Sequence, residues 1–205
     1  MLRQIRMMPA APSEEPTTTE PPITEPKEVV IDELEESGMF RLYFIRHTPA
    51  EAPADFEGPD AQRPLTKRGR KKLREAREGL RALIGVPDAI ITSPYARSQE
   101  TAEIVAKSLR FAGAVELNDH LVHGGDPHML ASILDAHTGE RDLILVGHSP
   151  DLERWIAHLT TGDEANVFLE MKKGGVCRVD VLTHAPALKG VLRWAVPPSV
   201  LRSLS

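Results

Sequence analysis

Two arginines and two histidines that could hold an anion stand at or just beyond the ends of three apolar runs. Arg46 and His47 close the run RLYFIRH, His148 closes DLILVGH, and Arg97 follows DAIIT in the stretch SPYARSQETA. Guanidinium groups bind phosphoryl oxygens through paired N–H donors, and a neutral imidazole is nucleophilic near pH 7. Together these residue types predict a binding site for a dianion, in particular a phosphoryl group.

The three apolar runs are predicted to be strands of one parallel sheet. They cover residues 41–47, 88–94 and 142–148. A helical pattern follows each run, beginning near Thr66, Ala96 and Asp151. Nearly continuous apolar strands separated by helices are typical of a parallel sheet covered on both faces. Ligands of such sheets bind outside the carboxyl ends of the strands, so we expect the four side chains to meet there.

The remaining segments complete a predicted α/β fold. Thr66 can cap one helix that continues to Gly85, with apolar residues on a single face: Leu73, Ala76, Leu80, Leu83 and Ile84. A short strand is expected at 114–117, a helix near 126–137, and an antiparallel pair at 175–182 and 190–197. The predicted architecture is a three-layer sandwich. It has a mostly parallel central sheet flanked by helices, and an antiparallel closing strand near the C-terminus.

The first 38 residues differ in composition from the rest of the chain. Residues 1–38 are rich in Pro, Thr and Glu and are predicted to be a disordered acidic tail. Residues 39–205 then form the predicted catalytic domain. Met39 is an alternative start to Met1, because the folded pattern begins there.

The overall composition excludes several classes of protein. The chain is 41% apolar, carries a net charge of −5 and has no concentrated basic stripe, which argues against a nucleic-acid partner. No apolar run reaches the roughly 18 residues of a membrane span, and the N-terminus lacks an apolar signal core. The single cysteine, Cys177, excludes a disulfide framework and suits a reducing compartment. We therefore expect a cytoplasmic protein that contacts neither membrane nor nucleic acid.

Four stretches of the sequence resemble the signature motifs of the histidine phosphatase superfamily, and they occur in the same order. These are FIRHT, RPLTKRG, TSPYARSQETA and LVGHSP; the short chain and the ending LRWAVPPSVL are similar to the SixA-type phosphohistidine phosphatase branch. The resemblance implies that His47 is a nucleophile that becomes phosphorylated. It also implies that Arg46, Arg97 and His148 hold the phosphoryl group. The implied partner is a phosphorylated protein, for example one that carries phosphohistidine, or a small phosphorylated molecule.

The sequence departs from the family pattern at two points. Thr48 stands where the family usually has glycine, and we find no counterpart of the glutamate that donates a proton in many members. Glu116 is expected to be buried in a strand, Asp126 is expected to cap a helix, and neither is expected to be an efficient donor. Substrates with good leaving groups, such as phosphohistidine and aryl phosphates, should then be preferred. No metal or other cofactor is expected if arginines and a protonated His148 supply the positive charge.

Three other interpretations remain open from the sequence. GHSPD partly resembles a serine hydrolase elbow with Ser149 as nucleophile, although its fifth residue is Asp151 where the sharp turn requires glycine. A metal could be held by a set of loop residues: His120, His123, Asp126 and His128. Finally, Thr48 leaves open a phosphate-binding module without catalytic activity.

Overall fold

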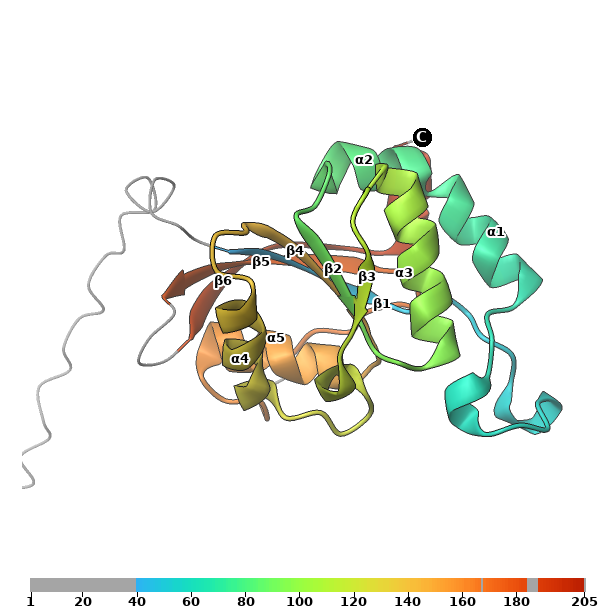
Figure 1. Ribbon diagram of the computed structural model, residues 1–205, viewed down its shortest axis with the longest axis horizontal. Helices are drawn as coiled ribbons and strands as arrows, with labels where there is room; N and C mark the ends of the chain where they lie inside the picture. Colours follow the sequence, from blue (N-terminus) through green and yellow to red (C-terminus); the bar gives the residue numbers. More distant parts are fainter. Residues whose placement is uncertain (1–39, 167, 184–187, 205) are drawn as a thin grey trace, which may run out of the picture. The chain divides into compact units, whose positions relative to one another are not determined.

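A computed structural model describes residues 40–166, 168–183 and 188–204. The predicted tail, 1–38, lies outside the described residues. The centre is a six-stranded sheet in the order β3-β2-β4-β1-β5-β6 (Figure 1). Its strands are β1 (Arg41–Arg46), β2 (Ala89–Thr92), β3 (Val115–Leu117), β4 (Asp142–Gly147), β5 (Val176–Thr183) and β6 (Lys189–Val196). The first four are parallel and the last two antiparallel, which confirms the predicted fold class and the closing pair.

Helices cover both faces of the sheet. One face packs on α1 (Lys67–Glu75), α2 (Arg77–Ile84), α3 (Ala96–Leu109) and α6 (Pro198–Ser203), and the other on α4 (Leu130–Ala136) and α5 (Asp151–Thr161). Figure 1 shows α2 and α3 on one side of the strands and α4 and α5 on the other. Successive β1 side chains alternate between the two resulting cores, with Leu42 and Phe44 in one and Tyr43 and Ile45 in the other. Because both faces of β1 are buried, its inner residues are all apolar. A strand with one face in solvent would instead alternate apolar and polar residues.

The helix predicted from Thr66 to Gly85 is in fact two helices. The Thr66 hydroxyl accepts a hydrogen bond from the Gly69 N–H at 2.9 Å, so the predicted cap is correct. The chain leaves the helical conformation at Ala76, between α1 and α2, with ψ of 4°. In α2, a Cβ on Gly79 would lie 2.0 Å from the Leu201 carbonyl oxygen of α6. The absence of a side chain at Gly79 therefore permits a close approach of α2 to α6 that helical periodicity does not reveal.

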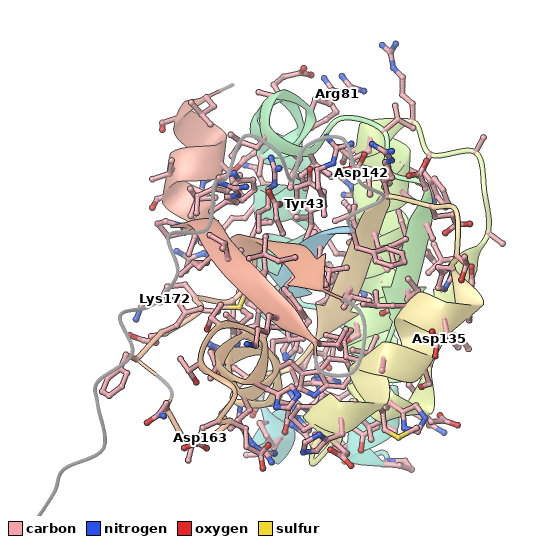
Figure 2. The ribbon with its side chains drawn as sticks, turned by 90° about the vertical axis from the view of Figure 1, so that its left-hand side faces the viewer. Tyr43, Arg81, Asp135, Asp142, Asp163 and Lys172 are labelled. Atoms are coloured by element: carbon pink, nitrogen blue, oxygen red, sulfur yellow. The ribbon has the colours of Figure 1, made fainter. Side chains whose placement is uncertain are left out.

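Polar side chains close the amino ends of β1 and β4. The hydroxyl of Tyr43 donates to Oδ1 of Asp142 at 3.2 Å, and both residues are labelled in Figure 2. Arg41 forms an ion pair with the same carboxylate. The Asp88 carboxylate accepts from the Arg141 and Asp142 N–H groups. These groups satisfy one another at this end of the sheet, whereas the carboxyl ends of the same strands hold polar atoms without partners, as described below.

Among the described residues, no helix is long and apolar enough to span a membrane.

Candidate active site

The strand register brings His47 and His148 together. β1 and β4 pair in parallel with Arg46 opposite Gly147, and the His47 N–H donates to the Gly147 carbonyl at 3.0 Å. Each histidine therefore directly follows the end of its strand, and their ring centroids lie 5.2 Å apart. β2 lies on the other side of β4 and leads into α3, which places Arg97 at the same edge. The structure thus brings all four predicted site residues to the carboxyl ends of the parallel strands.

One ring nitrogen of His47 is hydrogen-bonded, and the other has a free lone pair. Its Nδ1 lies 2.8 Å from the Thr48 carbonyl oxygen, and because a carbonyl only accepts, Nδ1 carries the proton. The lone pair of Nε2 is then free to attack an electrophile. Burial lowers the pKa of His47 to about 4, an effect that Arg97 and Arg46 reinforce and the Thr48 hydrogen bond partly opposes. At neutral pH the imidazole is therefore uncharged and able to act as a nucleophile.

Thr48 fits its position without backbone strain. In the described part of the chain, Arg110 is the only non-glycine residue with positive φ, so residue 48 does not need the freedom of glycine. The Thr48 N–H donates to Thr101 Oγ1 at 3.2 Å, and the Thr101 hydroxyl donates to the Arg97 carbonyl at 2.7 Å. These contacts tie the segment after β1 to the first turns of α3. The departure from the family pattern therefore leaves the backbone of the site in an ordinary conformation.

Arg97 is buried, with only 1% of its surface exposed, and its guanidinium contacts acceptors that a phosphoryl group could replace. Nη1 donates to the Asp60 carbonyl at 2.9 Å, and Nη2 lies 3.0 Å from Asp60 Oδ2 and 3.2 Å from His123 Nε2. The guanidinium also lies over the Tyr95 ring, 4.8 Å from its centroid. Asp60 thus supplies to Arg97 the kind of negative charge that a phosphoryl oxygen would supply.

Arg46 and Lys173 add positive charge to the same region. The Arg46 Nη1 donates to the Met171 carbonyl at 2.5 Å, which fixes the side chain near the end of β1. Burial lowers the pKa of Lys173, and the nearby charges of Arg46, Arg63 and Arg97 lower it further. Neither Lys173 nor Arg63 was a predicted site residue. Arg63 could have been found, because it begins the signature-like stretch RPLTKRG.

His148 differs from its predicted charge state. It is completely buried, and its Nε2 lies 2.9 Å from Ser93 Oγ and 3.4 Å from Ser98 Oγ. Burial lowers the pKa of His148 to about 2, and the neighbouring His123 and His47 lower it as well. A protonated His148 was expected from the sequence, whereas in the site without a phosphoryl group the burial of the ring and its neighbours favour the neutral imidazole. The arginines therefore carry the positive charge of the site.

Polar atoms without partners gather at this edge of the sheet. In the described ranges, five buried side-chain nitrogen or oxygen atoms have no hydrogen-bond partner. Four of them belong to the site: Arg46 Nε, Thr48 Oγ1, Arg97 Nε and His148 Nδ1. Folded proteins rarely leave buried polar groups unsatisfied, and such exceptions often mark a place where a ligand binds. The cluster is therefore suited to bind a polar group that offers several acceptors.

The loop residues considered as alternative metal ligands do not converge. Asp126 Oδ1 accepts from the His128 N–H at 2.9 Å and so caps a short 3-10 helix, η5 (Pro127–Met129), as predicted. The His128 ring packs against His158, 4.5 Å between centroids. Nowhere in 40–166, 168–183 or 188–204 do three His, Cys, Asp or Glu side chains form a group able to hold a metal. Glu116 is 52% exposed and 3.6 Å from His137, so the expectation that the strand buries it was wrong.

His123 is the member of that set that reaches the site. Its ring lies 4.2 Å from that of His148, centroid to centroid, and its Nδ1 lies 3.0 Å from Asp151 Oδ2. Sequence reasoning treated His123 only as a loop ligand, and no periodic pattern could have placed it here. Ser149 forms no hydrogen bond with a histidine within the described residues, and Asp151 contacts His123 instead. The serine hydrolase interpretation therefore gains no support.

Because His47 is buried in its neutral form, we expect the protein to become less stable as the pH falls. Its pKa is about 4 in the folded protein and 6.5 without that burial, so between these values the unfolded chain binds the extra proton. The contribution of His47 to the free energy of unfolding is complete above pH 6.5 and decreases as the pH falls towards 4. In the His47→Gln variant, the slope of the free energy of unfolding against pH should be smaller than in wild type, by up to about 1.4 kcal/mol per pH unit. Urea titrations from pH 7 to pH 4.5 measure it; equal slopes in wild type and variant would contradict a buried neutral imidazole.

A buried imidazole with a free Nε2, beside two guanidiniums at the edge of an α/β sheet, is an arrangement suited to phosphoryl transfer. The sequence model of the histidine phosphatase superfamily (branch 1) matches residues 42–122. An uncharacterized protein of Picosynechococcus sp. is 34% identical over 143 residues, covering 66% of this chain and 81% of that protein. The phosphohistidine phosphatase SixA of Escherichia coli is 24% identical over 164 residues, covering 79% and 96%.

Solved structures share the fold. The protein histidine phosphatase SixA complexed with tungstate superimposes with a TM-score of 0.69 at 22% identity, covering 79% of this chain and 99% of that one. A mycobacterial glucosyl-3-phosphoglycerate phosphatase gives 0.60 at 15% identity, covering 76% and 97%. The chain belongs to the histidine phosphatase superfamily. It is accordingly a phosphatase, as the four sequence motifs indicated.

Proposed function

We propose that this phosphatase works through a phosphohistidine at His47 and that its main substrate is phosphohistidine in a protein. Arg46, Arg97 and His148 hold the phosphoryl group in this proposal, and residues 39–205 are its catalytic domain. The observation that supports it most directly is the cluster of unpartnered polar atoms on Arg46, Arg97 and His148, beside the free His47 Nε2. A tetrahedral dianion offers three oxygens to these groups while its phosphorus faces the nucleophile.

The reaction proceeds in two displacements. In the first, the His47 Nε2 lone pair forms a bond to phosphorus, and the leaving group departs with the electron pair of the broken bond. Arg97 exchanges the Asp60 carboxylate for phosphoryl oxygens, so two guanidiniums stabilise the charge that builds up in the transition state. In the second, water attacks the phosphohistidine and loses a proton to solvent, and the electron pair of the P–N bond returns to Nε2.

Phosphohistidine suits this site because its leaving group needs little help. The free ring nitrogen of a phosphoimidazole accepts a proton from solvent near neutral pH, so a neutral imidazole departs. The rim of the site is also accessible, since Asp60 is 51% exposed and His123 45% exposed. An accessible rim favours a side chain on a protein surface. A second candidate, a small metabolite with another anionic group, is favoured by the extra charges of Arg63 and Lys173 beside Arg46 and Arg97.

The two substrate classes can be separated by kcat/KM. We expect a histidine-phosphorylated peptide to be hydrolysed at least about tenfold more efficiently than free phosphoimidazole, because the peptide also contacts the rim. Both should exceed glycerol 3-phosphate, whose alkoxide is a far poorer leaving group. If glycerol 3-phosphate or a bisphosphorylated metabolite gave the higher kcat/KM, the metabolite would replace the protein as the proposed substrate.

A further inference from the structure

A histidine–carboxylate pair stands beside the phosphoryl site and has no role in the two displacements described above. We propose that His123, held by Asp151, is the general acid that protonates the leaving group. This would extend the activity from phosphoramidates and aryl phosphates to phosphate esters of ordinary alcohols. The inference rests on the proposed function, since it assumes that His47 is the nucleophile. It adds a donor that the sequence, with Glu116 and Asp126 as its candidates, did not supply.

The contacts of His123 fix the orientation and tautomer of its ring. Asp151 is the first residue of α5 and is buried, and its Oδ1 accepts from the Gly124 N–H at 3.0 Å while its Oδ2 faces His123 Nδ1 at 3.0 Å. A carboxylate accepts, so Nδ1 carries a proton. The other ring nitrogen, Nε2, lies 3.2 Å from Nη2 of Arg97, which only donates. The pair therefore aims His123 Nε2 at the guanidinium that binds the phosphoryl group.

The position of the ring suits contact with the leaving group. Three imidazoles follow one another, His47, His148 and His123, with 5.2 Å and 4.2 Å between successive centroids. His47 is buried at one end, 7% exposed, and the His123 side chain is 45% exposed at the other. In an in-line displacement the leaving group points away from the nucleophile, here from buried His47 towards solvent. His123 is the exposed end of this row of rings, so a leaving group that departs towards solvent would pass close to it.

Substrate binding would free His123 Nε2. A phosphoryl dianion competes for Arg97 with Asp60 and with His123, and it offers more negative charge than either. Once Arg97 turns to the phosphoryl oxygens, Nε2 can take a proton from solvent, and the imidazolium is stabilised by Asp151 and the dianion. Arg154 lies 3.5 Å from Asp151 Oδ1, the oxygen that does not face His123, so Oδ2 remains free to accept from His123.

The proton transfer from His123 accompanies cleavage of the P–O bond. As His47 Nε2 bonds to phosphorus, the P–O bond breaks with its electron pair on oxygen, and the proton on His123 Nε2 moves to that oxygen to give the free alcohol. His123 is then neutral and accepts a proton from the water that attacks the phosphohistidine. The products are the alcohol and inorganic phosphate; His123 then releases to solvent the proton that it took up on substrate binding, so both histidines return to their neutral starting states.

A purely positioning role makes a different prediction. If His123 only oriented Arg97, its removal would slow the hydrolysis of all phosphate substrates by a similar factor. A general acid matters only when the leaving group is basic, so its removal spares phosphoimidazole and 4-nitrophenyl phosphate. The dependence of kcat/KM on leaving-group basicity therefore separates the two roles.

The test compares wild type with His123→Gln on phosphoimidazole, 4-nitrophenyl phosphate, phenyl phosphate and glycerol 3-phosphate. We expect kcat/KM to change by less than about threefold for the first two and to fall by about 10²–10³ for glycerol 3-phosphate. The matched control is His128→Gln, on the same loop but packed against His158, which should match wild type throughout. A uniform loss across the series, or no loss on glycerol 3-phosphate, would overturn the proposal.

Two further measurements keep the result interpretable. Asp151→Asn should reproduce the selective loss on glycerol 3-phosphate in a smaller degree, and its melting temperature reports whether the start of α5 stays folded. Quench-flow detection of a phosphoenzyme from 4-nitrophenyl phosphate in His123→Gln tests the proposed function separately. If this phosphoenzyme forms at the wild-type rate without a selective loss on the alkyl ester, only the role of His123 fails. If no phosphoenzyme forms even in wild type, the role of His47 fails.

Discussion

His47→Ala is expected to abolish hydrolysis of every phosphate substrate and to leave the protein folded. The substitution removes the nucleophile, so kcat should fall by at least about 10⁴-fold, a loss of the size seen when a covalent catalyst is deleted. The fold should persist, because the main-chain bond from residue 47 to the Gly147 carbonyl does not involve the side chain. Initial rates on 4-nitrophenyl phosphate and far-UV circular dichroism measure the two effects.

Ser149→Ala is the matched control for His47→Ala. Ser149 directly follows His148, but no contact within the described residues prepares its hydroxyl for attack. The variant should therefore keep wild-type activity within about twofold. An active His47→Ala together with an inactive Ser149→Ala would restore the serine hydrolase interpretation.

Arg97→Ala is expected to have the second largest effect. Loss of one preorganised donor to the transition state corresponds to about 2–4 kcal/mol, or 10²–10³ in kcat/KM. Arg97→Lys should recover only part of this, because an ammonium group lacks the planar fork that binds two oxygens. Water can solvate the half-exposed Asp60 carboxylate, but removal of the buried Arg97 side chain also leaves a cavity, so the melting temperature of each variant should be measured beside kcat/KM.

A surface arginine serves as the control for this experiment. Arg70 forms an ion pair with Glu100 on the flanking helices and should change kcat/KM by less than about twofold when replaced by Ala. Equal effects of Arg97→Ala and Arg70→Ala would contradict a direct contact between Arg97 and the phosphoryl group.

The predicted meeting of the four site residues depended on features that short-range patterns encode. Apolar runs that end abruptly in Arg46-His47 and in Gly147-His148 identify strand ends, and parallel strands place those ends at one edge. Arg97 could be placed at the same edge because its helix was predicted to begin at Ala96, which is where α3 begins in the structure. These inferences required only the order and type of the elements.

Other features of the site depend on packing that the sequence does not display. The position of His123 follows from a loop held by the carboxylate of Asp151, and the contact of Asp60 with Arg97 follows from η3 (Asp60–Gln62), a short 3-10 helix. Neither segment has a periodic pattern. The neutral state of His148 likewise depends on burial against Ser93 and Ser98, which appears only once α3 packs on β4. Loop conformation and depth of burial were therefore the properties that sequence reasoning missed.

In the proposed mechanism, turnover proceeds through a phosphoryl group bound to Nε2 of His47. This phosphoenzyme can be trapped by mixing the enzyme with 4-nitrophenyl phosphate, quenching within the first turnover and locating the phosphoryl group by mass spectrometry. We predict an acid-labile, base-stable phosphoenzyme with the phosphoryl group on His47, absent from His47→Ala. A phosphoryl group on Ser149 or on another histidine, or turnover without any phosphoenzyme, would contradict it.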